Sequence, residues 1–294
     1  MKRSGGGRRR RRNAVRSLLC VVCALAIAAI AHASPAHAAE HRPKAAAGAR
    51  SPKIRASSAV VLDSQNGTLL FAKNEKELRP IASITKLMTA LVFVETGESL
   101  RSRVVVEAPD REGASRTIFR VGEEVTAHDL LFAALLNSDN VAARCLARAS
   151  GLSPEEFVAR MNRKARLMGL VDMHFEDPTG LDPRNVGTAL DCAALVESAR
   201  RDPFLRTILM TQEHSFHTGK RLHTLQSTNR LLHASDTVIV GKTGFIEEAG
   251  YCFASCFDSA GRDLAVVVLG ARSTSARFRE ANDLIHWALD EAAR

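Results

Sequence analysis

The chain lacks any apolar run long enough to make it a protein that crosses a membrane several times. Its longest such run, residues 18–30, has about thirteen residues, whereas a helix needs roughly 20 to span a bilayer. With 46% hydrophobic and 25% charged residues, the composition is that of a soluble globular protein. It excludes a wholly disordered, collagen-like or coiled-coil chain. A length of 294 residues favours one or two domains.

Acidic residues are absent from the first 38 positions, which instead hold eight Lys or Arg residues. This segment supplies most of the formal net charge of +9. Residues 58–294 carry 28 basic and 31 acidic side chains, so this part of the chain is slightly acidic. A protein that binds nucleic acid through phosphates needs a basic surface. We therefore expect no nucleic-acid partner.

Residues 1–38 have the parts of a secretory signal peptide: a basic stretch, an apolar run and small residues at a cleavage site. The basic stretch ends at Arg16, and cleavage is predicted after either Ala33 or Ala38. An uncleaved membrane anchor is the alternative. If the segment is removed, no later apolar run could serve as a stable membrane anchor.

No Cys-x-x-Cys pair survives removal of that segment, which argues against zinc bound by cysteines. Four cysteines remain, namely Cys145, Cys192, Cys252 and Cys256. The last two stand four residues apart in one expected strand, at about 3.3 Å per residue, and are too far apart to bridge each other. We expect buried thiols that behave as small hydrophobic side chains, although an oxidising compartment permits disulfides.

Residues 39–57 are rich in Ala, Pro, Lys and Arg and lack apolar periodicity, so we predict a flexible linker before a domain of residues 58–294. Asn66-Gly67 between two apolar runs predicts a hairpin of strands 59–63 and 68–72. Later strands are expected at 238–241, 250–257 and 264–270. Periodicity and capping residues predict helices at 83–95, 126–136, 141–149, 153–168, 188–200 and 274–292. This order predicts an α/β (α+β) fold with one sheet built from both ends of the domain.

Ser83 and Lys86 stand three residues apart at the start of an expected buried helix. Residues at this spacing share a helix face, so the lysine amine could take the serine proton and make the hydroxyl a nucleophile. The lysine pKa must fall from about 10.4 for this role, which burial and a nearby cation could achieve. A helix cap beside a surface lysine is the simpler interpretation of this motif alone.

Two further triplets carry polar groups at the expected edge of a cleft. Ser138-Asp139-Asn140 falls at the break between two helices, and Lys242-Thr243-Gly244 follows the β-branched run 238–240. A lysine and a hydroxyl beside glycine could bind a substrate carboxylate. Taken singly, each triplet is as well explained by turn, cap or surface chemistry.

Together, in this order, the three motifs resemble the signature set of penicillin-interacting serine acyl-transferases. The chain is similar to the low-molecular-mass penicillin-binding proteins, the D-alanyl-D-alanine carboxypeptidase and endopeptidase family of serine peptidases. Longer blocks at residues 79–89, 136–143, 175–181 and 241–245 share the likeness, which covers roughly residues 58–290. It implies the penicillin-binding protein/β-lactamase-like fold, with an antiparallel sheet flanked by helices and a helical subdomain.

The resemblance also implies a role for each motif residue and no metal or other cofactor. Ser83 would be the acylated nucleophile and Lys86 its base, while Ser138 would relay a proton to the leaving amine. The remaining residues would bind substrate: Asn140 at the acyl side, and Lys242 and Thr243 at the carboxylate. The backbone N–H groups of Ser83 and Phe245 would bind the oxyanion, and Gly244, directly before Phe245, would let the backbone approach closely.

The likeness is greatest to the branch of D-alanyl-D-alanine endopeptidases that includes penicillin-binding protein 7. Only about fifty residues follow Lys242, so we expect no C-terminal β-domain or amphipathic anchor. The implied partners are peptidoglycan stem peptides as substrates and β-lactam antibiotics as covalent inhibitors. The expected location is the periplasm, either free or loosely associated with the wall or membrane.

Three alternative functions remain at this point. A serine β-lactamase would need a glutamate to activate water, and Glu176 is the candidate. A zinc peptidase would draw on the histidines, of which His214 and His217 are the only close pair in residues 58–294. A non-catalytic wall-binding protein would carry a vestigial site.

Overall fold

The computed structural model describes residues 51–114, 117–233, 238–259 and 261–292. The predicted signal peptide at 1–38 and most of the predicted linker at 39–57 lie outside these residues. The described end of the linker contacts the domain, because the backbone N–H groups of Arg55 and Ala56 donate to the Glu280 carboxylate at 3.0 and 2.8 Å. Lys73 Nζ donates to the carbonyl of Ala56 at 2.7 Å.

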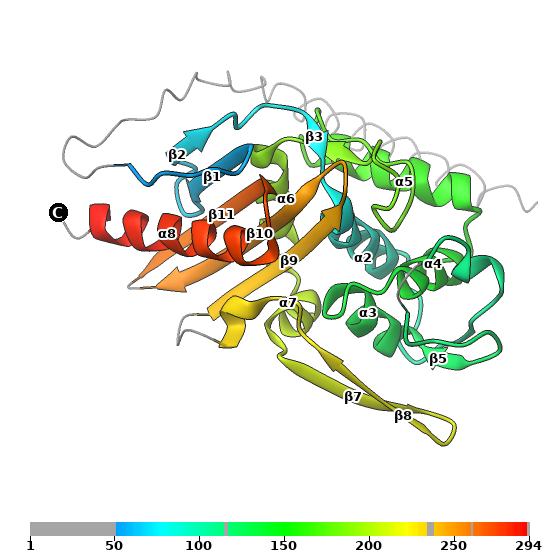
Figure 1. The fold of residues 1–294 in the computed structure, drawn as a ribbon. Helices are drawn as coiled ribbons and strands as arrows, with labels where there is room; N and C mark the ends of the chain where they lie inside the picture. The colour runs from blue at the N-terminus through cyan, green and yellow to red at the C-terminus, as the bar shows by residue number, and fades with distance from the viewer. Residues whose placement is uncertain (1–50, 115–116, 234–237, 260, 293–294) are drawn as a thin grey trace, which may run out of the picture. The chain divides into compact units, whose positions relative to one another are not determined.

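A five-stranded antiparallel sheet, with order β2-β1-β11-β10-β9, forms one half of the domain (Figure 1). The first strand, β1, pairs directly with the last, β11, which confirms that the two ends of the domain build one sheet. The predicted hairpin is present, with Gly67 at a φ of 73° in its turn. The five strands are β1 (Ser58–Asp63), β2 (Leu69–Lys73), β9 (Val238–Ile246), β10 (Gly250–Ser259) and β11 (Arg262–Ala271).

Helices cover both faces of this sheet, as Figure 1 shows for α8 (Thr274–Ala292) and α6 (Ala189–Arg201). Alternate residues of β10 supply the two cores, as expected for a strand buried on both sides. Phe253 and Phe257 pack with Phe278 of α8. Cys252 and Cys256 point into the larger core on the other side. All four predicted thiols are free and buried, which confirms that they act as core side chains.

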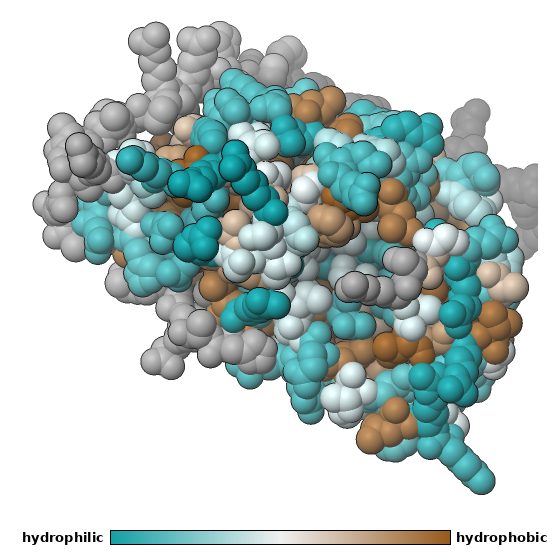
Figure 2. Space-filling view, in the orientation of Figure 1, coloured by the Kyte–Doolittle hydropathy of each residue, from teal (hydrophilic) through white to brown (hydrophobic). Residues whose placement is uncertain are grey.

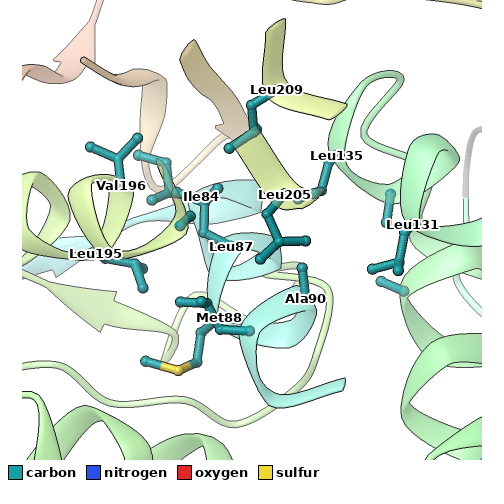
Figure 3. Packing of buried hydrophobic residues seen from close by; sticks show 14 of the residues in the cluster. Ile84, Leu87, Met88, Ala90, Leu131, Leu135, Leu195, Val196, Leu205 and Leu209 are labelled. Atoms are coloured by element: carbon teal, nitrogen blue, oxygen red, sulfur yellow. The ribbon is translucent and has the colours of Figure 1, made fainter. Parts of the chain in front are cut away.

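The helical half of the domain packs around α2 (Thr85–Glu95), whose residues 85–93 are all buried. Figure 3 shows Leu87 and its neighbours on α2 facing leucines of three other helices, among them Leu131, Leu195 and Leu205. The helices of this half are α3 (Ala127–Leu135), α4 (Asn140–Ala149), α5 (Pro154–Leu167) and α7 (Pro203–Met210). This packing fixes the N-terminus of α2 against the edge strand β9, where the motifs meet.

Three of the predicted helix starts have the capping bonds that the sequence predicts. Thr126 accepts from the backbone N–H of Asp129, and Ser153 and Thr188 form complete capping boxes with residues three positions on. The predicted helix at 83–95 is shorter than expected: it begins at Thr85, and Ser83 lies in a preceding 3₁₀ turn, η1 (Ala82–Ile84).

Several short elements were not predicted. The most prominent is a second hairpin, β7 (Glu213–Thr218) and β8 (Arg221–Gln226), which extends below α3 in Figure 1. Its polar residues hide the strand pattern, since every second side chain is exposed to solvent. The other unpredicted elements are α7, η2 (Pro109–Arg111), η3 (Arg230–His233), and the paired strands β3 (Arg79–Pro80) with β6 (Val186–Gly187) and β4 (Arg103–Val105) with β5 (Glu124–Thr126).

Hydrophilic residues predominate on the face drawn in Figure 2, and hydrophobic residues lie there in separate patches. Among the described residues, none of the helices combines the length and apolar character needed to cross a membrane.

Candidate active site

The three sequence motifs meet at one cavity of about 890 Å³. Ser83 comes from η1, Ser138 and Asn140 from the junction of α3 and α4, and Thr243 from β9. Because β9 is the edge of the sheet beside the helical half, the cavity lies where the two halves of the domain meet. It is lined by Ser83, Arg111, Ala114, Thr117, Ile118, Asn137, Ser138, Asn140, Leu181, Thr228, Thr243, Gly244, Phe245, Tyr251, Thr274 and Arg277.

Ser83 is held by a strained backbone on one side and a close backbone contact on the other. The preceding residue, Ala82, has a φ of 48°, a left-handed conformation that residues with a Cβ rarely adopt. Gly180 approaches so closely that a Cβ there would stand 2.0 Å from the Ala82 carbonyl oxygen. Only glycine can therefore occupy position 180 without displacing the turn that carries Ser83.

Lys86 lies completely buried beneath Ser83. Its Nζ donates to Ser83 Oγ at 2.8 Å, to Asn140 Oδ1 at 2.7 Å and to the Thr179 carbonyl at 2.7 Å. Burial lowers its pKa to about 7; the charges of Asp177 and Asp139 oppose this shift and Arg144 adds to it. When neutral, the amine can keep two of these bonds and turn its lone pair toward the Ser83 proton. The predicted base thus has both the contact and the pKa that its role requires.

Burial is the largest cause of the low Lys86 pKa, as the residues around the motif predicted. The acceptor at Thr179 belongs to a turn that Asp177 organises. The Asp177 carboxylate accepts from Gly180 N at 2.8 Å and from Asp182 N at 2.8 Å. It also binds Asn185 Nδ2 at 3.0 Å. The turn therefore presents a carbonyl oxygen to Lys86 as a fixed feature.

Ser138 and Lys242 form the second contact between motifs. Ser138 has a φ of 61°, which turns the chain sharply between α3 and α4. Lys242 Nζ donates to Ser138 Oγ at 2.7 Å and to the Thr243 carbonyl at 3.0 Å. Burial lowers the pKa of Lys242 well below its ordinary value, and the nearby charges of Lys86 and Arg277 lower it further. Lys242 lies within β9, which extends five residues beyond the predicted strand end.

The backbone of β9 passes close to Ser83 at Gly244. A Cβ at this glycine would stand 3.1 Å from the Ser83 amide nitrogen and 2.9 Å from the Ile81 carbonyl oxygen. The absence of a side chain therefore lets the backbone next to Phe245 approach the nucleophile. Phe245 itself is half exposed at the cavity and packs against Tyr251, with ring centroids 4.3 Å apart.

Asp139, the central residue of its triplet, supports the site in a way that the sequence motif alone did not identify. Its buried carboxylate accepts from Ala142 N, Thr117 Oγ1 and Ile118 N, each at 3.1 Å. Burial raises its pKa, and these hydrogen bonds and Lys86 oppose the rise. Asp139 thus caps α4 and holds a cavity-lining segment in place. The Asp-x-x spacing before a helix was the available signal.

Arg277 is a second residue that the motifs do not include. It is 7% exposed and donates from Nη1 to the carbonyls of Gly244 at 3.0 Å and Cys252 at 3.3 Å. Burial lowers its pKa to about 10. Since Arg277 and Thr243 both line the cavity, this end of the cavity can bind an anionic group. No sequence signal distinguished Arg277 from Arg279, the other arginine of its helix.

Glu176, the candidate base of a β-lactamase, lies elsewhere. It lines a separate cavity of about 710 Å³ and pairs with His174 at 3.1 Å and Arg184 at 3.7 Å. Its neighbour Asp177 organises the turn described above. Glu176 is not among the residues that line the cavity with Ser83, which argues against its activating water there.

Comparison with known proteins identifies the family of the chain. Residues 45–273 match the model of a family described as D-alanyl-D-alanine carboxypeptidase. A D-alanyl-D-alanine endopeptidase of Pseudomonas aeruginosa is 33% identical over 282 residues, which cover 94% of this chain and 88% of the relative. A D-alanyl-D-alanine endopeptidase of Escherichia coli is 30% identical, over 83% of this chain and 80% of the relative.

Solved structures share the fold. A D-alanyl-D-alanine carboxypeptidase from Mycobacterium tuberculosis superposes with a TM-score of 0.78 at 26% identity, covering 85% of this chain and 96% of that chain. The DD-transpeptidase of Streptomyces K15 gives a TM-score of 0.76 at 26% identity, over 82% and 100% of the two chains. The predicted penicillin-binding fold is therefore confirmed. The chain belongs to the D-alanyl-D-alanine carboxypeptidase family and is a serine DD-peptidase.

Proposed function

We propose that this serine DD-peptidase cleaves D-alanyl peptide cross-links of peptidoglycan through an acyl-enzyme on Ser83. The observation that carries the residue assignment is the 2.8 Å contact from Lys86 Nζ to Ser83 Oγ, made by a buried lysine whose pKa is about 7. At neutral pH a substantial fraction of such an amine is unprotonated. It can then accept the serine proton as the hydroxyl attacks the substrate carbonyl.

The tetrahedral intermediate places negative charge on the former carbonyl oxygen. The backbone N–H groups of Ser83 and Phe245 are the proposed donors to this oxygen, and the close approach at Gly244 supports the assignment. Such preorganised donors typically contribute a few kcal/mol to the transition state. Asn140 is proposed to bind the amide on the acyl side while its Oδ1 keeps Lys86 in place.

The leaving amine must gain a proton when the peptide bond breaks. Ser138 is the proposed relay, because its hydroxyl can pass a proton to the amine and replace it from Lys242 at 2.7 Å. Lys242 and Thr243 are proposed to bind the carboxylate on the leaving side, and Arg277 adds positive charge to the same end of the cavity. Water then hydrolyses the ester on Ser83: the proton that the water loses restores Lys242 through Ser138, and Lys86 returns its proton to the Ser83 oxygen. A β-lactam would acylate the same hydroxyl and leave a long-lived ester.

The choice of cross-links as the main substrate is supported by the relatives named D-alanyl-D-alanine endopeptidase, which match most of this chain. Both cross-link and pentapeptide cleavage use one acyl-enzyme and differ in the leaving group. The proposed place of action is the periplasm, which export by the predicted signal peptide at 1–38 would reach. In the same proposal, residues 39–57 link that segment to the catalytic domain of residues 58–294.

The test compares cross-linked dimeric muropeptides with monomeric pentapeptide muropeptides as substrates for the purified protein, with products identified by mass spectrometry. We expect dimer cleavage by the wild type and by Ser215→Ala, which changes an exposed hydroxyl on β7. We expect none by Ser83→Ala. Cleavage of the pentapeptide alone would make the protein a carboxypeptidase, and dimer cleavage by Ser83→Ala would overturn the assignment of the nucleophile.

A further inference from the structure

Two histidines from distant parts of the chain converge on one carboxylate oxygen outside the active-site cavity. His214 Nε2, on β7, lies 2.9 Å from Asp129 Oδ1, and His128 Nδ1 lies 3.1 Å from the same atom. The ligand atoms of the three residues all lie within 4.8 Å of one another. We propose that His128, Asp129 and His214 form a binding site for a divalent transition metal, with Zn²⁺ as the best fit.

The donor set suits such an ion chemically. Two imidazole nitrogens and one carboxylate oxygen, with an open fourth position, are a common zinc ligand set. Zinc bonds of about 2.0–2.1 Å in a tetrahedron place ligand atoms roughly 3.3 Å apart. Both nitrogen–Oδ1 distances are already near this value. The remaining nitrogen–nitrogen distance is within 4.8 Å, and a rotation of His128, whose side chain is 39% exposed, would shorten it.

The surroundings orient the ligands. Thr126 Oγ1 donates to Asp129 Oδ2 at 2.6 Å, which leaves Oδ1 as the oxygen that faces both imidazoles. A partner of this kind behind a ligating carboxylate is typical of metal sites. The ring of Phe132 stacks on His214 with centroids 3.8 Å apart and contacts His128 at 4.9 Å. The imidazole plane of His214 is therefore held before any ion arrives, while that of His128 can still adjust.

Metal binding at this site requires no reactant other than the ion, because only protons are displaced. Each neutral imidazole would present to the ion the nitrogen that now faces Asp129, and its ring proton would reside on the other nitrogen. A doubly protonated imidazole would release one proton on binding. Asp129 and His214 are 14% and 18% exposed, so the ion can enter from solvent and keep water as its fourth ligand.

The place of the site in the fold suggests a structural consequence. Asp129 is in the first turn of α3, while Ser138 follows the other end of that helix. His214 belongs to the β7–β8 hairpin, and Thr228, just beyond β8, donates to the Leu136 carbonyl through its backbone N–H at 3.0 Å and contacts Thr243 Oγ1 at 2.8 Å. A bound ion would join the hairpin to α3 and stabilise the segments that flank the cavity.

The test titrates the purified protein, first stripped with a chelator and desalted, with ZnCl₂ in a calorimeter, and repeats the titration with MgCl₂. Co²⁺ then serves as a spectroscopic probe, because its absorption bands report tetrahedral nitrogen and oxygen ligation. The variants are His214→Ala and the more exposed His128→Ala. His217→Ala is the matched control, since His217 is exposed on the same strand. Penicillin labelling of each variant verifies that it is folded.

We expect one equivalent of Zn²⁺ to bind and to raise the melting temperature, because the ion binds the native state in preference to the unfolded chain. Mg²⁺ should give neither effect. Loss of a residue that only supports a metal ligand typically weakens metal binding roughly 10- to 100-fold. Zn²⁺ affinity should fall by more than this in His214→Ala and in His128→Ala, because each variant loses a ligand. His217→Ala should bind Zn²⁺ as the wild type does. The proposal would be wrong if Zn²⁺ showed no saturable binding, or if folded His214→Ala and His128→Ala bound Zn²⁺ as the wild type does. The contacts of the two histidines with Asp129 would then be ordinary hydrogen bonds.

Discussion

Lys242 and Ser138, 104 positions apart in sequence, are joined by a 2.7 Å hydrogen bond. A second bond of 2.7 Å joins Lys86 to Asn140. These two contacts connect all three motifs, so the motif residues form a single hydrogen-bonded network at the cavity. Two buried lysines in one such network repel each other, which is one cause of the low pKa of Lys242. Substitution of any of these four residues should therefore affect acylation of Ser83.

Acylation by penicillin should depend on pH through Lys86. Its pKa is lowered to about 7, so the amine is protonated below pH 7 and becomes neutral above it. The rate constant for acylation should therefore rise about tenfold per pH unit below 7 and level off above it. Stopped-flow measurement with a chromogenic β-lactam between pH 5 and 8 checks this.

Lys86→Arg supplies the control for the pH profile. An arginine stays charged throughout this range, so the variant should lose at least the 10²- to 10⁴-fold that a general base contributes. Lys164→Arg, at a surface ion pair with Glu95, should behave as the wild type. A wild-type rate that does not change between pH 5 and 8 would contradict Lys86 as the base.

Gly180→Ala should damage both stability and acylation. Its φ of 81° already costs a residue with a Cβ about 1–2 kcal/mol, and the contact of that Cβ with the Ala82 carbonyl adds about 1–3 kcal/mol of strain. Gly169→Ala is the matched control, because Gly169 has a φ of 77° and open space around it. Urea unfolding should show a larger loss for Gly180→Ala, and only this variant should acylate slowly; equal behaviour of the two would refute the role given to the close contact.

Asp139→Ala should destabilise the domain by about 2–4 kcal/mol, since it removes a helix cap and leaves buried donors unpaired. It should also slow acylation, because residues 117–118 line the cavity. The exposed cap Ser153→Ala should cost only about 1 kcal/mol and leave acylation unchanged. Denaturant unfolding and penicillin labelling measure the two effects. An Asp139→Ala protein with wild-type stability would contradict this role.

The four buried cysteines should resist thiol reagents in the native state. Burial raises the pKa of Cys252 to about 11, and it raises the pKa values of Cys145, Cys192 and Cys256 too. The reactive thiolate is therefore scarce as well as shielded. Labelling with a maleimide followed by peptide mass spectrometry should find these four positions modified only after unfolding. Rapid labelling of any of them in the folded protein would show that the core is open there.

Much of the fold was predictable because local signals agree with it. The Asn66-Gly67 turn, the capping residues Ser153 and Thr188, and the apolar strands near the C-terminus all appear where the sequence predicts them. The sequence did not predict the β7–β8 hairpin, because its inward-facing residues include His214 and His223, and a hydrophobicity pattern counts histidine as polar. His214 stacks on Phe132 and stays partly exposed, whereas His223 stacks on Phe216 and is buried.

The motif residues of the site were predictable because each motif is short and local, but the contacts between them depend on the fold. No pattern near Arg277 indicates that it reaches the carbonyl of Gly244 in a strand 33 positions earlier. Likewise, Glu176 and Asp177 are adjacent in sequence and both line a separate cavity, yet the Asp177 carboxylate organises the turn under Lys86 while that of Glu176 pairs with His174 and Arg184. Such differences arise from tertiary packing.

The most direct test of the account is to locate the acyl group. The purified wild type and Ser83→Ala are incubated with penicillin, and the intact masses and the modified peptide are determined by mass spectrometry. We predict one adduct per wild-type molecule, attached to Ser83, and no adduct in Ser83→Ala. An adduct on another residue, or one that persists in Ser83→Ala, would contradict the assignment of Ser83 as the nucleophile.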